Sequence, residues 1–174
     1  DESEDVEEKM RRLLEKSKDE TRRVKEEVER LNEESKRVTE EVEKRVRDLL
    51  REVREKVRDK DVLEEIERRA RKLVKELREL NREITERSKR SREELDKLNK
   101  KIEDDLRKIK KKLDDGKDVE TVLREAKRLI EESIERIERV LKENRELAER
   151  SIKVLRDVLR EVEDLIRKLE ERAK

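Results

Sequence analysis

The chain has 174 residues, of which 61% are charged, and its 54 Lys and Arg nearly balance its 53 Asp and Glu. His, Cys, Pro, Gln and all aromatic residues are absent, which excludes disulfides, thiolate zinc sites and nucleophilic catalysis of the Ser–His or Cys–His kind. Only 29% of the residues are hydrophobic, so the core must be thin. Charges of mixed sign at helical spacing are typical of long helices or coiled coils.

Two short breaks divide the chain into three predicted helices, over about residues 5–58, 62–113 and 118–174. The breaks lie at residues 58–61 and at residues 114–118. None of the three segments contains Pro or Gly, so nothing in them predicts a kink.

Residues near the breaks predict how the helices begin and end. Asp5 is followed three residues later by Glu8, and Asp61 by Glu64, and both pairs resemble the capping box at a helix start. Gly116, the only glycine, suits the left-handed position that follows many helix C-termini.

Apolar residues recur at steps of three and four along each predicted helix, which is the heptad pattern of coiled coils. Short connections make consecutive helices antiparallel neighbours. The sequence therefore predicts an all-α fold, an elongated antiparallel up-down-up three-helix bundle with coiled-coil packing. We expect residues 1–174 to form this bundle as a single domain.

Uncharged polar residues lie on or beside the apolar stripes rather than on the charged surface. If the chain folds back at each break, facing residue numbers sum to about 120 between the first two helices and about 231 between the last two. This register predicts three hydrogen-bonded layers with one residue from each helix, and a partial fourth. Their members are Thr21, Asn99 and Ser133; Asn32, Ser88 and Asn144; Thr39, Asn81 and Ser151; and Ser35 with Thr85.

The predicted layers favour a role in specifying the fold rather than in binding a ligand. A buried polar group without a hydrogen bond is costly, so a slipped helix would be destabilised by about 1–3 kcal/mol for each unpaired group. Ser17 and Ser91 find no partner by the register rule. They either bond their own backbone carbonyls or are satisfied by a partner chain.

The chain resembles de novo designed helical bundles with buried hydrogen-bond networks. The resemblance rests on the narrow residue alphabet, on heptads such as residues 24–31, on short capped connections and on Ser, Thr and Asn placed at the helix seams. Such designs often assemble as homo-oligomers or paired heterodimers, so the resemblance implies an interaction role. Natural rods similar to spectrin repeats are the second resemblance, although they typically carry a core Trp that is missing here.

The third predicted helix is the most apolar, with 22 hydrophobic residues against 14 and 15 in the first two. Either its flanks pack against both neighbours, or the extra residues form a face for a partner helix or a second copy. The residues of this possible partner face are Leu123, Ile134, Leu141, Ile152, Leu159 and Ile166.

Other function classes receive little support. Residues 107–112 are basic and could touch phosphates, but no aromatic side chain is present to stack on bases, and the basic charge also suits a helix C-terminus. We expect no nucleic-acid or membrane partner, no cofactor, no metal and no enzymatic activity. The sequence assigns no cellular location and fits a soluble protein expressed recombinantly in the cytoplasm.

The prediction from sequence is thus a designed structural scaffold without a natural biochemical activity, its fold specified by buried polar layers. The alternative is a helix-binding or self-assembling module that uses the apolar face of the third helix.

Overall fold

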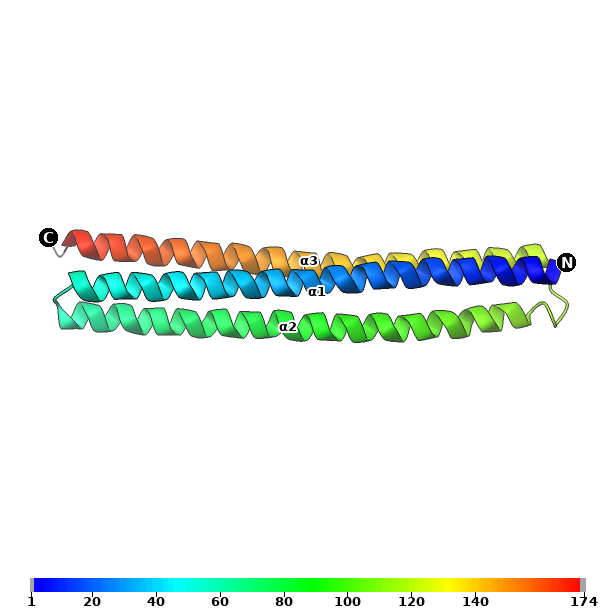
Figure 1. Ribbon diagram of the computed structural model, residues 1–174, viewed down its shortest axis with the longest axis horizontal. Coiled ribbons are helices and arrows are strands. Elements are labelled where there is room, and N and C mark those ends of the chain that lie inside the picture. The colour runs from blue at the N-terminus through cyan, green and yellow to red at the C-terminus, as the bar shows by residue number, and fades with distance from the viewer. Residues whose placement is uncertain (1, 173–174) are drawn as a thin grey trace. The chain divides into compact units, whose positions relative to one another are not determined.

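The computed structural model describes the backbone of residues 2–172 and the side chains of residues 4–172. It contains the helices α1 (Glu2–Lys56), α2 (Lys60–Lys111) and α3 (Val119–Arg172), and no strand occurs within residues 2–172 (Figure 1). The predicted all-α three-helix bundle is confirmed. The predicted ends lie within three residues of the observed ones, except that residues 173–174 of the third predicted helix lie outside the described range.

The first helix begins earlier than its predicted cap. α1 already includes Glu2, so Asp5 lies inside the helix and does not cap it. There Asp5 pairs with Lys9 at 3.6 Å, and Glu8 pairs with Arg12 at 2.9 Å, both at the i, i+4 spacing. Acidic side chains in the first turns stabilise a helix through its dipole, which explains why the segment before Asp5 continues as helix.

The connection between α1 and α2 is capped by Asp59 rather than by Asp61. The Asp59 carboxylate accepts a 3.0 Å hydrogen bond from the backbone N–H of Asp61, and the Asp59 carbonyl accepts one from the N–H of Leu63 at 3.1 Å. Asp59 is thus the N-cap, and Asp61 lies in the first turn. The predicted capping box at Asp61 and Glu64 is therefore wrong, because the cap lies two residues earlier, at Asp59.

The connection between α2 and α3 confirms the predicted role of Gly116, which has a φ of 93°. Its N–H donates to the carbonyl of Leu113 at 3.2 Å, and the N–H of Lys117 donates to the carbonyl of Lys112 at 3.0 Å. These two bonds form a Schellman motif, which satisfies carbonyls at the end of α2. α3 then starts after Asp118, whose carboxylate accepts a 3.0 Å bond from the N–H of Thr121.

Contacts group the chain into two compact units, each built from one segment of every helix. Unit 1 comprises residues 1–30 and 88–145, and unit 2 comprises residues 31–87 and 146–174. In each unit the α2 segment runs antiparallel to the α1 and α3 segments (Figure 1). Whether residues 1–174 behave as a single domain stays a prediction.

Each unit has its own apolar core of heptad residues. In unit 1, Val24, Leu95 and Ile137 are completely buried, and in unit 2, Val53 and Leu155 are. Small shifts from the predicted seams occur, since Leu73 and Ala148 are buried while their neighbours Val74 and Leu147 are only half-buried. In both pairs the residue of the predicted stripe lies at the edge of the core, and the residue next to it in the sequence is the buried one.

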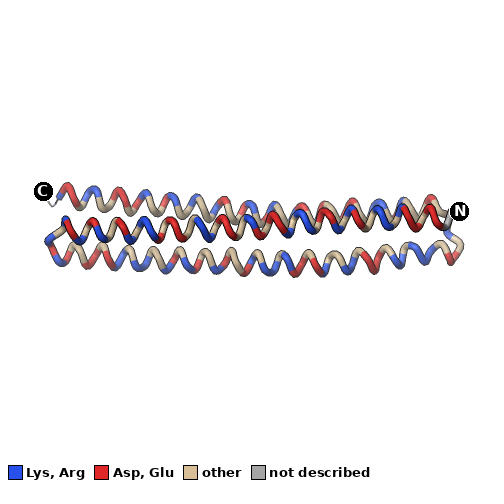
Figure 2. The backbone as a smooth tube through the Cα atoms, in the orientation of Figure 1, with Lys and Arg blue, Asp and Glu red and all other residues tan. Residues whose placement is uncertain are grey.

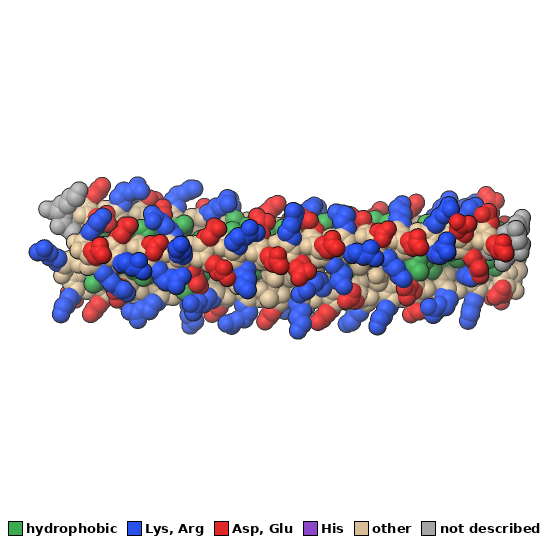
Figure 3. Space-filling model, in the orientation of Figure 1, with side chains coloured by type: hydrophobic (Ala, Val, Ile, Leu, Met, Phe, Trp, Pro, Cys, Tyr) green, Lys and Arg blue, Asp and Glu red, His purple; other side chains and the backbone are tan. Residues whose placement is uncertain are grey.

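Charged residues of both signs alternate along all three helices (Figure 2). Hydrophobic side chains are visible only in small areas between the charged ones on the face that Figure 3 shows. Ion pairs also join neighbouring helices, for example Lys25 with Asp96 at 2.6 Å in unit 1 and Arg54 with Glu67 at 2.7 Å in unit 2. Exposed pairs of this kind each contribute about 0–1 kcal/mol, so apolar burial must supply most of the stability.

Candidate functional site

The first predicted polar layer is formed in part. The Thr21 hydroxyl donates to the Asn99 side-chain carbonyl at 3.3 Å and to the backbone carbonyl of Ser17 at 2.9 Å. One hydroxyl proton serves both acceptors, so the shorter bond to Ser17 takes the larger share. Ser133 is buried, but it makes no hydrogen bond to Thr21 or Asn99. The layer is therefore a link between α1 and α2 and does not include α3.

The second predicted layer is replaced by a different pair. The Asn144 amide donates at 2.8 Å to the hydroxyl of Ser91 and at 2.8 Å to the backbone carbonyl of Val140. Both of its protons are thus bonded, and both side chains are buried. Ser88, the predicted partner, is buried with its hydroxyl unbonded. Ser91, for which the register rule found no partner, is the residue that bonds Asn144.

The remaining predicted layers lie in unit 2, and one hydrogen bond between their uncharged polar side chains and another helix forms there. The Thr85 hydroxyl donates to the Asn32 side-chain carbonyl at 3.3 Å, and Thr85 itself is exposed. Thr39 and Ser151 are buried, but neither bonds Asn81, whose side-chain oxygen is buried without a partner. Ser35 is completely buried and its hydroxyl is also unbonded. Three-helix layers are thus not formed in this unit.

The three threonines at the seams share one local geometry. Thr21, Thr39 and Thr85 each donate at 2.9 Å to the backbone carbonyl four residues earlier, which belongs to Ser17, Ser35 and Asn81 respectively. Such bonds to the preceding turn are an intrinsic alternative for Ser and Thr inside helices. Every residue at i−4 offers a backbone carbonyl, so this bond was available to each Thr inside a helix, but the register rule considered only partners on other helices.

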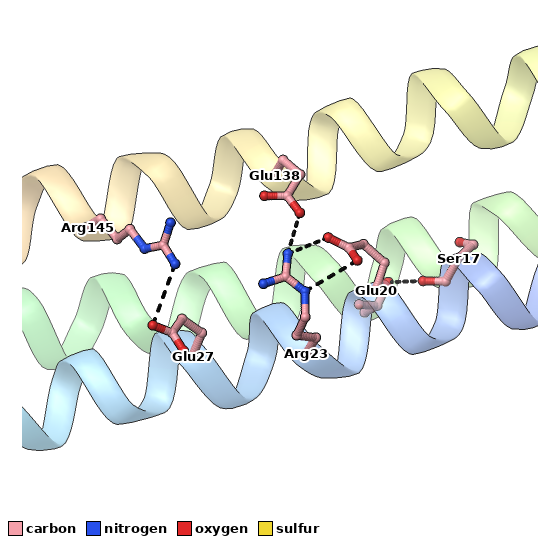
Figure 4. A network of polar contacts seen from close by, with 7 residues as sticks. Ser17, Glu20, Arg23, Glu27, Glu138 and Arg145 are labelled. Atoms are coloured by element: carbon pink, nitrogen blue, oxygen red, sulfur yellow. Dashed lines mark hydrogen bonds and ion pairs between the residues drawn. The ribbon is translucent and has the colours of Figure 1, made fainter.

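A charged cluster in unit 1 was not predicted. Arg23 bonds Glu20 at 2.6 Å and also pairs with Glu138 on α3, and Glu27 lies 3.6 Å from Arg145 (Figure 4). The spacing of Glu20 and Arg23 along one helix could have suggested the first contact, but nothing in the sequence identified the partner on α3.

Two carboxylates of this cluster, Glu20 and Glu138, differ in their acidity. The hydrogen bond from the Arg23 guanidinium holds the pKa of Glu20 below its ordinary value, and the bond with Glu138 acts in the same direction. The pKa of Glu138 is raised, first by its hydrogen bond with Glu20 and then by burial. Because the Glu138 and Arg23 side chains are about half exposed, solvent screens the cluster, and we assign it to helix pairing rather than to acid–base chemistry.

The possible partner face on α3 is partly used inside the bundle. Leu141 and Ile166 are buried, which corrects the expectation that they are open to a partner. Leu159 is half-buried and packs against the apolar core of unit 2. Leu123, Ile134 and Ile152 are also half-buried, and Val154, which was not in the predicted set, is 49% exposed.

No helix within residues 2–172 is long and apolar enough to cross a membrane. In the same part of the chain, no group of three or more acidic side chains is arranged to hold a metal ion.

Comparisons with known proteins add no family assignment. No protein-family model matches the sequence, and neither a curated protein nor a solved structure is similar to it.

Proposed function

We propose that the chain is a structural scaffold of the designed-bundle type, in which buried polar contacts specify how the helices pair and no biochemical activity is attached. The observation that carries this proposal is the bond between Asn144 and Ser91. It lies inside an apolar interface and joins α2 to α3, and the second amide proton of Asn144 is donated to the backbone carbonyl of Val140 in α3. A slipped α3 would leave one buried amide proton of Asn144 without an acceptor, which penalises the wrong register.

The proposal can be tested through the register of α2 against α3. Spin labels at the exposed positions Glu94 and Lys142, both in unit 1, report the distance between the two helices. We expect one narrow distance distribution in the parent chain. In the variant that combines Ser91→Ala with Asn144→Leu, we expect a broader or split distribution while helical circular dichroism is retained.

The matched control is Thr39→Val, since the Thr39 hydroxyl bonds only its own helix. This variant should keep the helix pairing that its parent has, because Val preserves the shape of the side chain. If the double variant keeps the same narrow distribution as the parent and the control, polar contacts do not set the register and the proposal fails.

A second candidate function is self-assembly or helix binding through α3. The observation that favours it is the 49% exposure of Val154, the one large hydrophobic residue that is exposed in the described part of the chain, with half-buried Ile152 nearby in sequence. Light scattering with refractive-index detection suits a chain without aromatic residues. A mass above 21.4 kDa that returns to that value in the Ile152→Glu and Val154→Glu variants would support assembly. A constant mass of one chain would contradict self-assembly.

A further inference from the structure

Unit 2 contains a groove between α1 and α2 with an apolar floor. Its volume is about 510 Å³, and its floor consists of Val46 and Ala70, which are buried in the core. Leu50 and Val74 form its half-buried walls and pack against that core. The small side chain of Ala70 leaves a depression at a heptad position, where a larger residue would fill the space between the helices.

The rim of this groove carries a strong excess of positive charge. Five of its residues are basic, and Glu79 is the only acidic one. The basic residues are Arg47, Arg71, Lys75, Arg78 and Arg82, and all five are exposed. This local excess contrasts with the chain as a whole, whose formal net charge is only +1.

Few carboxylates neutralise this rim. Arg78 bonds Glu43 at 3.0 Å, and Arg71 lies 3.7 Å from Glu67. Within residues 4–172, Arg47, Lys75 and Arg82 make no ion pair with any carboxylate. Three guanidinium or ammonium groups are thus available to an external anionic partner on the edges of an apolar depression.

Two other grooves within the described residues lack this combination. The groove between α2 and α3 in unit 2 has an apolar floor that includes Leu73 and Val162, but its three basic and three acidic residues balance. A larger groove of unit 1, about 710 Å³ in volume, is lined by five basic and four acidic residues and contains no apolar side chain. The groove between α1 and α2 in unit 2 thus combines an apolar floor with a mostly basic rim, and neither of these two grooves does so.

We propose that the groove formed by α1 and α2 in unit 2 binds an acidic amphipathic helix, supplied by a partner protein. A helix that lies between two others buries an apolar stripe in the groove and places its flanking residues at the rim. Glu and Asp at those flanking positions would pair with Arg47, Lys75 and Arg82. This site goes beyond the scaffold role and uses a different surface from the α3 face.

The apolar floor favours an acidic helix over two other anionic partners, a nucleic acid and a membrane surface. A nucleic acid presents phosphates and bases, and the groove offers no aromatic side chain for stacking. A membrane surface needs protruding apolar anchors, whereas Val46 and Ala70 lie at the bottom of a depression. An apolar stripe flanked by carboxylates matches both the floor and the rim.

The test is fluorescence anisotropy with the full chain and a fluorescein-labelled peptide of roughly four heptads, long enough to be helical when bound. The peptide carries Leu at a and d and Glu at e and g. We expect saturable binding that weakens as salt is raised. The Lys75→Glu and Arg82→Glu double variant should bind at least about tenfold more weakly, because two attractive rim contacts become repulsive.

Matched controls separate this site from general charge effects. The Lys72→Glu and Lys168→Glu double variant has the same net charge change but alters the balanced groove between α2 and α3, so it should bind within about twofold of the parent, affected only by long-range screening. Circular dichroism of both variants verifies that the helices are intact. A peptide with Lys in place of Glu at e and g should not bind.

Several outcomes would overturn the proposal. Equal binding of the acidic and basic peptides would show non-specific apolar association. Equal losses in the two double variants would show that only net charge matters. Tighter binding to phosphatidylserine vesicles or to a DNA duplex than to the acidic helix would assign the groove to another class of partner. A dimer by light scattering that the Lys75→Glu and Arg82→Glu variant disperses would identify a second copy as the occupant.

Discussion

Removal of the hydroxyl of Ser91 should destabilise the protein, although Ala is the better helix former. Ser91→Ala leaves one amide proton of Asn144 without an acceptor in a site where Asn144 is only 7% exposed. A buried donor that loses its partner costs about 1–3 kcal/mol, and the higher helix propensity of Ala offsets about 0.5 kcal/mol of this. We therefore expect a net loss of about 0.5–2.5 kcal/mol in the free energy of unfolding.

Asn144→Leu should behave differently from Ser91→Ala. It removes the buried amide and adds apolar surface, and the Ser91 hydroxyl that remains can rotate toward a backbone carbonyl of its own helix. The stability of this variant should equal or exceed that of the parent. With both substitutions no polar group is left unpaired, so the loss caused by Ser91→Ala should vanish in the Asn144→Leu background. The coupling energy should therefore equal that loss, about 0.5–2.5 kcal/mol.

Guanidinium unfolding followed by far-ultraviolet circular dichroism measures all four proteins of this cycle. With a denaturant dependence of about 2–6 kcal/mol per molar, a change of 1 kcal/mol moves the midpoint by about 0.2–0.5 M. Thr39→Val is the control, and it should change stability by only a few tenths of a kcal/mol, since its hydroxyl bonds the helix backbone alone. A coupling energy indistinguishable from zero would refute the assignment of the Asn144 bond.

The remaining predictions concern unpaired groups, a helix cap and a titrating pair. Asn81→Leu and Ser35→Ala should each raise the free energy of unfolding by about 0.5–2 kcal/mol, because each removes a buried polar atom without a partner; a lower denaturation midpoint in either would contradict this. Asp118→Ala should lower the midpoint, since it removes the acceptor for the Thr121 N–H, whereas Asp118→Asn should restore it. In a carboxyl NMR titration, the pKa of Glu20 should lie below the ordinary value of 4.5 and the pKa of Glu138 should lie above it. Because its folded pKa is lowered, Glu20 stabilises the folded state at pH above 4.5, and this stability is lost as the pH falls through the folded pKa. Because its folded pKa is raised, Glu138 stabilises the folded state at pH below 4.5, and this stability is lost as the pH rises through the folded pKa. Equal pKa values for the two would disprove the cluster.

The helices could be predicted because their signals are local and repeated. Heptad spacing and two short breaks placed all the observed ends within three residues, and Gly116 marked the end of α2 because only a left-handed residue closes a Schellman motif. The choice of cap was less certain because Asp59 and Asp61 both precede apolar heptads. Only the backbone bond from the N–H of Asp61 distinguishes the two.

The polar partners could be predicted only in part, because they depend on the reach of side chains and not on register alone. The register rule correctly paired Thr21 of α1 with Asn99 of α2. It failed for Asn144, which bonds Ser91 rather than Ser88, a residue one helical turn away. An amide spans that turn easily, so residue numbers do not decide between two serines three positions apart. The rule also ignored backbone carbonyls, which take the protons of all three seam threonines.

The bond from Thr39 to the carbonyl of Ser35 determines what this threonine presents to its neighbours. Its only proton is already engaged inside its own helix, so the surface turned to the other helices consists of a methyl group and oxygen lone pairs. Such a surface accepts hydrogen bonds and cannot offer one. An amide or ammonium group is therefore a suitable complement to this side of Thr39. The interfaces of this chain thus distinguish donors from acceptors, a chemical polarity that hydrophobic pattern alone does not encode.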